Sequence, residues 1–265
     1  MRCIATGFAV LLILAYSEQA EGTTVYTNNF EGSVGSEWSS TTTSVTPVGA
    51  RGFLGEFENE TVTLTLGSLP QHDSTTVSFD LFLIRSWDGT LPGSLGTDPY
   101  APDIWSLQVG GGDELLRTTF GNFDGPGDSQ AYPDSYPGGS HPHGTGASEI
   151  QTLGYFWLGS FPLDSVYNFS FTFPHTANEL ALEFAASMAE TVVPIIDNES
   201  WGLDNVEISI NPVPEPSTSS FRRSACFRWA FVHGAADGHD IVHTAIDLEL
   251  NLASIAQRSR PSHKP

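Results

Sequence analysis

Apolar and polar side chains alternate with a period of two over short stretches of the chain. Residues 61–66 read Thr-Val-Thr-Leu-Thr-Leu, and residues 167–173 place one Tyr and three Phe side chains on one face, with Asn, Ser and Thr on the other. Such alternation is typical of strands with one buried and one solvated face. Strand signals also predict five further strands, at residues 76–84, 104–109, 114–120, 179–186 and 201–210.

The segments between these strands are rich in Gly, Pro, Asp and Ser, and helical periodicity is nearly absent. Many short strands with turn-rich joints predict an all-β fold, an antiparallel β-sandwich of jelly-roll type. A parallel sheet needs strands that alternate with helices, and the chain lacks that rhythm.

The first 22 residues have the pattern of a signal peptide. Met1-Arg2 precede an apolar segment over residues 4–16, and the small residues Ala20 and Gly22 stand at a spacing suited to cleavage before Thr23. The apolar segment is too short to span a membrane. We therefore expect an exported protein whose mature domain covers residues 23–212.

The mature domain contains no cysteine, because Cys3 lies in the signal peptide and Cys226 in the C-terminal tail. It must therefore rely on its own core instead of disulfides, and about 190 residues are ample for one core. The chain carries 31 acidic and 10 basic residues, a net charge of −21. Such a surface disfavours nucleic acid and anionic membranes as partners, and it suits hard cations such as Ca²⁺.

Directly after the last predicted strand, residues 213–218 read Val213-Pro214-Glu215-Pro216-Ser217-Thr218. This hexapeptide resembles the opening of the PEP-CTERM sorting signal, found at the C-terminus of exported proteins in bacteria with thick extracellular polysaccharide. The resemblance implies an exosortase-type sorting machinery as a partner and a location at the cell surface or outside the cell.

In that family the tag is followed by a membrane-spanning apolar helix and a cluster of arginines. Residues 219–236 read SSFRRSACFRWAFVHGAA, with three arginines and no apolar run of the about 18 residues that a span requires. We therefore predict no stable membrane anchor. For residues 219–265 two interpretations stay open: an atypical tail that is disordered or frameshifted relative to the family, and a divergent tail with a short helix around residues 241–255.

A second resemblance covers nearly all of residues 28–210. Residues 79–89 read FDLFLIRSWDG, and Pro102-Asp103-Ile104-Trp105 and a glycine-rich turn at 110–112 follow. Together with residues 29–32 (NFEG) and 201–208 (WGLDNVEI), they look like a secreted β-sandwich that recurs in PEP-CTERM proteins. Its relatives resemble concanavalin-like and carbohydrate-binding jelly rolls, which supports the fold more than any ligand.

Carbohydrate-binding jelly rolls commonly hold a structural calcium between acidic residues near the first strand and on the last strand. Glu31 and Asp204 stand at the matching positions, so the resemblance implies a Ca²⁺ between them. Hydrogen bonds of a turn or a sheet edge are the alternative role for Asp204. Asp88 and Asp103, with Asp98 between them, form a second and weaker candidate cluster, because their spacing lacks the pattern of an EF-hand loop.

Residues 123–148 form a long irregular segment, and a loop of this length is either functional or mobile. Its residues Tyr132, Tyr136 and His141 are candidates to stack on or hydrogen-bond a sugar.

Signatures of catalysis are poor. The sequence has no nucleophile elbow, no zinc-protease motif and no phosphate loop. Residues 55–60 (GEFENE) depart from the two-carboxylate strand of concanavalin-like glycosidases. Glu56, Glu58 and Glu60 would share one strand face, which we expect to point outward. We therefore predict no enzymatic activity.

Three classes of function follow. We favour a non-catalytic exported surface or matrix protein that carries the sorting tag and is associated with extracellular polysaccharide. The alternative is a calcium-supported carbohydrate-binding module, and a glycoside hydrolase comes third. Tryptophans that line one open groove would favour the binding module, whereas buried ones would favour the surface protein; the five concerned are Trp38, Trp87, Trp105, Trp157 and Trp201.

Overall fold

The computed structural model describes residues 22–90, 102–122, 129–188 and 198–213. The chain divides into two units, residues 1–213 and 214–265, and the described ranges all belong to the first. The tail predicted at 219–265 lies outside the described residues. So do the signal peptide except Gly22 and the sorting tag except Val213.

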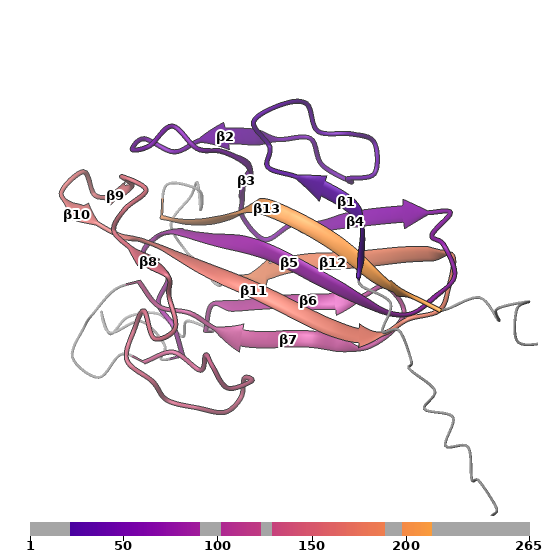
Figure 1. Cartoon of the computed structure of the whole chain (residues 1–265). Coiled ribbons are helices and arrows are strands. Elements are labelled where there is room, and N and C mark those ends of the chain that lie inside the picture. The colour runs from indigo at the N-terminus through magenta and orange to yellow at the C-terminus, as the bar shows by residue number, and fades with distance from the viewer. Residues whose placement is uncertain (1–21, 91–101, 123–128, 189–197, 214–265) are drawn as a thin grey trace, which may run out of the picture. The chain divides into compact units, whose positions relative to one another are not determined.

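Within the described residues the structure consists of strands (Figure 1). In chain order they are β1 (Thr23–Asn28), β2 (Thr43–Val45), β3 (Gly52–Phe57), β4 (Thr61–Gly67), β5 (His72–Arg85), β6 (Ile104–Val109), β7 (Glu114–Thr119), β8 (Glu149–Ile150), β9 (Phe156–Trp157), β10 (Phe161–Pro162), β11 (Asp164–Pro174), β12 (Glu179–Ser187) and β13 (Glu199–Pro212). This described part holds no helix long and apolar enough to cross a membrane.

All seven predicted strands are confirmed, as β4, β5, β6, β7, β11, β12 and β13. The other six were not predicted. Four of them, β2, β8, β9 and β10, are two or three residues long. The alternation of apolar and polar residues cannot be recognised over so few positions, because a strand pattern needs about four to eight.

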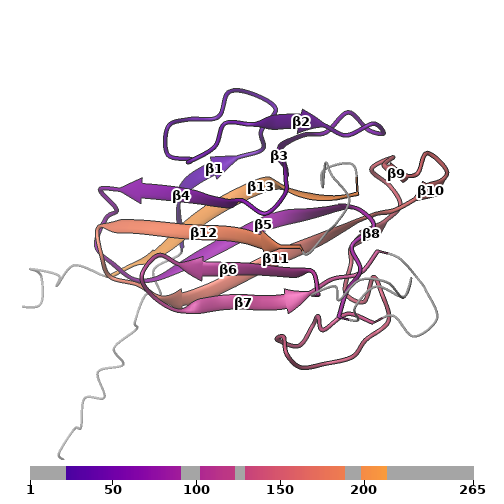
Figure 2. The ribbon, with the colours of Figure 1, turned by 180° about the vertical axis from the view of Figure 1, so that it is seen from behind.

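The strands form two antiparallel sheets. The larger sheet has the order β2-β3-β13-β5-β11-β8, with β1 also paired to β13, and the smaller sheet has the order β4-β12-β6-β7. Figures 1 and 2 show the two sheets as the layers of a sandwich. The hairpin β9–β10 belongs to neither sheet. The predicted antiparallel β-sandwich is therefore confirmed.

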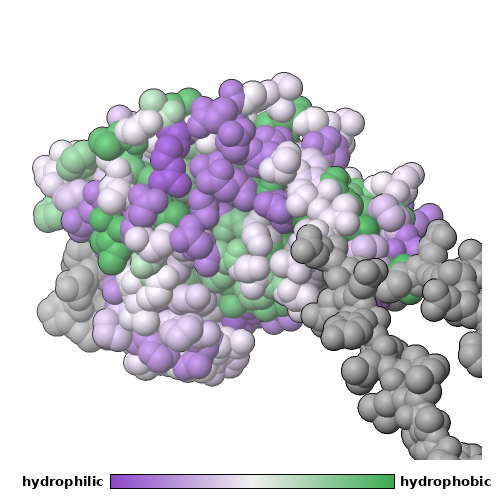
Figure 3. Space-filling view, viewed as in Figure 1, coloured by the Kyte–Doolittle hydropathy of each residue, from purple (hydrophilic) through white to green (hydrophobic). Residues whose placement is uncertain are grey.

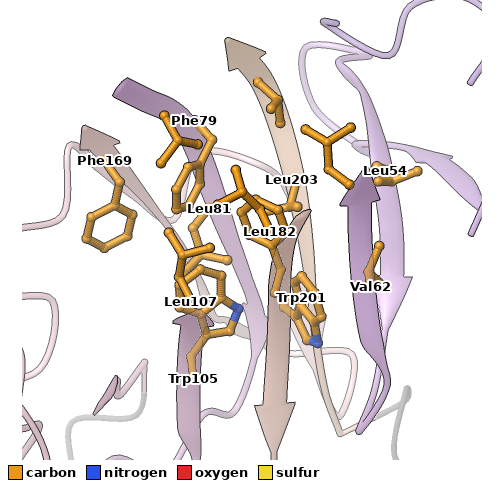
Figure 4. Packing of buried hydrophobic residues seen from close by; sticks show 14 of the residues in the cluster. Leu54, Val62, Phe79, Leu81, Trp105, Leu107, Phe169, Leu182, Trp201 and Leu203 are labelled. Atoms are coloured by element: carbon orange, nitrogen blue, oxygen red, sulfur yellow. The ribbon is translucent and has the colours of Figure 1, made fainter. Parts of the chain in front are cut away.

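The main core lies between the two sheets (Figure 4). Phe79 on β5 is opposite Phe169 on β11, and both rings point toward the smaller sheet. The indole of Trp105 stacks on Phe169 with ring centroids 6.2 Å apart, and it meets Trp201 edge-on at 6.0 Å. Aromatic side chains of this size contribute most of the apolar area that a sandwich core buries.

A second, smaller core covers the outer face of the larger sheet at one end. It consists of Phe53, Phe82, Ile84, Leu153, Tyr155 and Val166. Residues 151–155, which supply Leu153 and Tyr155, are held by the buried carboxylate of Asp164. Its Oδ1 accepts hydrogen bonds from the backbone N–H groups of residues 152 and 153, and its Oδ2 from those of residues 154 and 155, at 2.8 to 3.2 Å.

Candidate functional site

Four of the five tryptophans lie in the interior. Trp87, Trp105 and Trp201 are fully buried, and Trp38 is 4% exposed. Only Trp157 of the five is half-buried, in β9. Trp87, Trp105 and Trp201 therefore serve the core, whereas Trp38 also contributes to the lining of a surface hollow.

Three carboxylates converge at the end of the sandwich where β5 finishes and β13 begins. One oxygen from each of Asp88, Asp103 and Glu199 lies within 4.8 Å of the other two, and no other group of at least three potential metal ligands comes so close together in the described ranges. Asp103 and Glu199 are buried, and Asp88 is half-buried. We call this group the carboxylate cluster.

Hydrogen bonds between distant segments hold the carboxylate cluster in place. The backbone N–H of Asp88 donates to Asp103 Oδ2 at 2.6 Å, and the N–H of Asp103 donates to the carbonyl of Gly89 at 3.2 Å. Glu199 opens β13 opposite Arg85, the last residue of β5. Nearby, the indole N–H of Trp87 donates to the Ser200 carbonyl at 2.9 Å, which ties the segment after β5 to β13.

The sequence placed Asp88 and Asp103 in one cluster but missed Glu199. Glu199 stands far along the chain from both, and only the antiparallel pairing of β13 with β5 brings it there. Chemically, three carboxylates in this space repel one another and offer hard oxygen ligands. Ca²⁺ binds such oxygens at about 2.3–2.6 Å, so ligand oxygens on one ion are at most about 5 Å apart. The cluster therefore fits a hard divalent cation, with backbone carbonyls or water as further ligands.

Glu31 and Asp204 contact neighbouring residues of one segment, since Gly52 bonds to Glu31 and Arg51 lies beside Asp204. Each already accepts a backbone hydrogen bond: Glu31 Oε1 from Gly52 at 2.8 Å, and Asp204 Oδ1 from Asn205 at 2.7 Å. Arg51 Nη2 is 3.8 Å from Asp204 Oδ2. Burial, with the charges of neighbouring carboxylates, raises the pKa of Asp204 to about 6. The hydrogen-bonding role of Asp204 is thus present, and a Ca²⁺ between Glu31 and Asp204 stays a prediction.

The three candidate sugar ligands of the long loop take separate partners. Tyr132 packs against Phe120 with ring centroids 5.2 Å apart, and burial raises the pKa of its phenol. The guanidinium of Arg117 lies over the Tyr136 ring at 5.4 Å. His141 Nε2 is 2.9 Å from a carboxylate oxygen of Asp134. Their roles toward a sugar stay predictions.

The described part of this loop is well hydrogen-bonded. The buried amide of Gln130 donates to the carbonyls of Tyr132 and Thr145, and its oxygen accepts from Gly144 and from the Tyr167 hydroxyl. Residues 123–128 of the predicted segment lie outside the described residues.

Glu56, Glu58 and Glu60 do not share a strand face, so that expectation was wrong. β3 ends at Phe57, and Glu58 and Glu60 follow in the turn before β4. Glu56 Oε2 instead accepts hydrogen bonds from Arg85 Nη1 at 2.7 Å and from the Ser200 hydroxyl at 2.9 Å.

A surface hollow of about 420 Å³ lies at one place on the sandwich. Its lining contains a single carboxylate, whereas glycoside hydrolysis ordinarily uses two; the residues are Ser36, Glu37, Trp38, Ser39, Thr63 and Thr65.

Large apolar side chains are exposed on the hairpin β9–β10. Phe156 and Phe161 are 51% and 52% exposed, and Leu158 at the turn is 73% exposed. Sequence reasoning missed this hairpin, because each of its strands is only two residues long. Only the tertiary structure shows that the hairpin leaves both sheets.

No family model and no curated protein matches the chain. Among solved structures, it is similar to a carbohydrate-binding module of lichenase 5A from Cellvibrio mixtus in complex with cellotriose, with 13% identity, 72% of this chain and 100% of that chain covered, and a TM-score of 0.33.

Two enzymes are also similar to parts of the chain. The exo-β-1,3-galactanase of Phanerochaete chrysosporium with galactose has 12% identity, coverage of 71% of this chain and 29% of that chain, and a TM-score of 0.29. A 4-O-methyl-α-glucuronidase has 12% identity, coverage of 79% and 20%, and a TM-score of 0.27. At TM-scores this low, we draw no conclusion about function from these likenesses.

Proposed function

We propose that this chain is a non-catalytic protein that bacteria export to the cell surface or extracellular matrix, where it is associated with polysaccharide. The observation that carries the proposal is the complete burial of Trp87, Trp105 and Trp201. Aromatic rings committed to a core stabilise the fold and are not available to line a substrate groove. The strong negative charge adds solubility and disfavours nucleic acid and anionic lipid.

The position of the sorting tag supports export and sorting. Val213, the first tag residue, follows β13 directly and is 38% exposed, with its N–H bonded to the carbonyl of Gln71 at 3.3 Å. A tag that directly follows the last strand of the sandwich can be processed by an exosortase-type enzyme without cutting a strand.

Fractionation of a bacterium that carries an exosortase tests this function. The full chain is expressed there as wild type and as the triple variant Pro214→Ala/Glu215→Ala/Pro216→Ala. We expect the variant to shift from the surface fraction to another fraction, while Ser220→Ala, just beyond the tag, keeps the wild-type distribution. Equal distribution of the triple variant and wild type would overturn the sorting role.

A calcium-supported carbohydrate-binding module is the second candidate function. The carboxylate cluster favours it, because it offers hard oxygen ligands from three distant segments. The test is retention of the full chain on polysaccharides, once with Ca²⁺ and once with a chelator. Retention that requires Ca²⁺ supports the module. Equal retention in both buffers would show that polysaccharide binding does not depend on Ca²⁺.

A further inference from the structure

The hairpin β9–β10 ends in an exposed apolar tip. Phe156 and Phe161 are half exposed, and Leu158 at the turn is the most exposed large apolar side chain of the described residues. Figures 1 and 2 place the hairpin at one extremity of the sandwich, and Figure 3 shows hydrophobic surface at that end. Exposed apolar groups gathered at one place mark interaction sites.

The apolar side chains of the hairpin lie on both of its faces. Phe161 is opposite Trp157 in the pairing of the two strands, and their ring centroids are 6.1 Å apart. Pro162 is opposite Phe156. Opposite side chains share a face and successive ones alternate, so Phe156 and Phe161 point to opposite faces. We call this group the hairpin wedge: Phe156, Trp157, Leu158, Phe161 and Pro162.

The hairpin wedge is uncharged, and several of its polar groups bond within the protein. Residues 154–163 read GYFWLGSFPL and contain no charged side chain. The N–H of Ser160 donates to the Trp157 carbonyl at 3.2 Å, and the indole N–H of Trp157 donates to Asn198 Oδ1 at 2.6 Å. Because these donors already have partners, they do not oppose transfer of the hairpin wedge to an apolar medium.

The base of the hairpin is fixed on both sides. The N–H of Leu163 donates to the Tyr155 carbonyl at 3.1 Å, and the carbonyl of Leu163 accepts from the N–H of Arg85 at 2.7 Å. The Asp164 carboxylate holds the preceding residues 152–155. A hairpin that is ordered before binding loses little conformational entropy when its partner arrives.

We propose that the hairpin wedge inserts into the interface of a membrane made of zwitterionic lipids. This inference goes beyond the proposed function, because export and sorting do not require the sandwich itself to contact lipid. The boundary between lipid headgroups and acyl chains surrounds an inserted element, so it covers both faces and the tip at once. The indole of Trp157 suits this depth, because it combines an apolar ring with a polar N–H.

Geometry and charge favour lipid over other occupants. A flat partner, such as a protein surface or a polysaccharide chain, covers one face of the hairpin and leaves either Phe156 or Phe161 in water. With a net charge of −21, two copies of the chain repel each other, and anionic lipid is repelled as well. A zwitterionic lipid surface carries no net charge and meets no such barrier.

Sedimentation of the full chain with phosphatidylcholine vesicles tests the proposal. We expect wild type to bind and Leu158→Asp, which places a charge at the tip, to bind about tenfold or more weakly. Thr176→Asp is the matched control: it adds the same charge at an exposed position beyond the other end of β11 and should keep wild-type affinity. Every variant keeps the apolar segment at residues 4–16, so a loss of binding reports on the hairpin wedge.

Single substitutions distinguish a wedge from a flat contact. Phe156→Ala and Phe161→Ala each remove apolar area from one face, so we expect each to weaken binding about threefold or more. Phe156→Leu and Phe161→Leu keep most of that area and should bind nearly as wild type does. Replacing half of the phosphatidylcholine by anionic phosphatidylglycerol should weaken wild-type binding at low salt, because the chain is acidic.

Contrary outcomes overturn the proposal in different ways. Equal binding by Leu158→Asp and wild type would show that another part of the chain contacts lipid. A loss in only one of the two Phe→Ala variants would indicate a flat partner on that face. Losses in the Leu variants as large as in the Ala variants would indicate recognition of the rings, as by a sugar. If wild type does not bind the vesicles but self-associates through Leu158, a second copy is the occupant. The sorting experiment, which concerns residues 214–216, is independent of all these outcomes.

Discussion

His72 Nε2 and His175 Nδ1 lie 2.7 Å apart, at the end of the sandwich where the chain leaves β13. His72 is buried, and its Nδ1 is 2.5 Å from the carbonyl oxygen of Pro70. A carbonyl only accepts, so His72 Nδ1 carries the proton and its Nε2 accepts when the ring is neutral. His175 Nδ1–H is then the donor. The hydrogen bonds of the pair are complete when both imidazoles are neutral. Protonating both rings would place two positive charges next to each other.

This pair predicts a pH-dependent stability. Burial, and then the charge of a protonated His72, lowers the pKa of His175 below its ordinary value of 6.5. The folded state thus binds fewer protons here than the unfolded state as the pH falls below about 6.5, and this contribution to stability is lost toward acid. We expect the melting temperature of His175→Gln minus that of wild type to be larger at pH 5 than at pH 7.

Melting curves followed by circular dichroism measure this difference. His141→Gln is the control, because His141 pairs with Asp134 on a distant loop. Asp73, the carboxylate beside His72, stays in both proteins. A difference between His175→Gln and wild type that is constant from pH 7 to pH 5 would contradict the prediction.

Asp204 predicts the opposite pH dependence. Burial above all raises its pKa from 3.8 to about 6, so the folded state binds more protons here than the unfolded state between these values. Its contribution is therefore favourable at low pH and is lost as the pH rises through about 6. Asp204→Asn mimics the neutral form, and in a chelator we expect it to raise the free energy of unfolding at pH 7 by up to about 3 kcal/mol.

The gain from Asp204→Asn vanishes below about pH 4, where wild type is protonated too. Urea unfolding at pH 7 and pH 4 checks this. The variant also tests the Ca²⁺ predicted between Glu31 and Asp204. If the ion binds there, Ca²⁺ stabilises wild type more than the variant. An equal effect on both proteins would show that Ca²⁺ does not bind between Glu31 and Asp204.

Ca²⁺ at the carboxylate cluster is expected to raise the melting temperature of the full chain. At a free concentration of one hundred times Kd, binding adds about 2.7 kcal/mol to the free energy of unfolding. Asp103→Asn and Asp88→Asn each remove one charged ligand and should abolish most of the shift. Glu114→Gln, an exposed carboxylate on β7, should keep it. A calcium shift of wild-type size in both cluster variants would show that the ion binds elsewhere.

Truncating the Asp164 side chain should lower the stability of the fold strongly. Asp164→Ala leaves four backbone N–H groups without their acceptor, two of them in buried residues, and should lower the free energy of unfolding by about 3 kcal/mol or more. Asp164→Asn keeps one acceptor oxygen and should cost less. Chemical denaturation measures both, with the exposed Asp113→Ala as the control. Equal stability of Asp164→Ala and wild type would refute this role.

Local patterns in the sequence were enough to predict the sandwich and its seven principal strands. Alternation in segments such as 61–66 and 167–173 reports a local property, since successive side chains of a strand point to opposite faces. The same local logic explains why Asp88 and Asp103 were placed together, because they flank the end of one strand and the start of the next. The net negative charge of the chain and the lack of cysteine in the mature domain likewise follow from composition alone.

Tertiary structure decided which residues meet across the sequence. Glu199 joins Asp88 and Asp103 only because β13 runs antiparallel to β5, and strand pairing between distant segments leaves no mark in local periodicity. The hairpin β9–β10 pairs with neither of the two large sheets, and its Phe156 and Phe161 are half exposed, which their apolar character does not reveal. Burial depends on what packs against a residue, and that is a property of the whole fold.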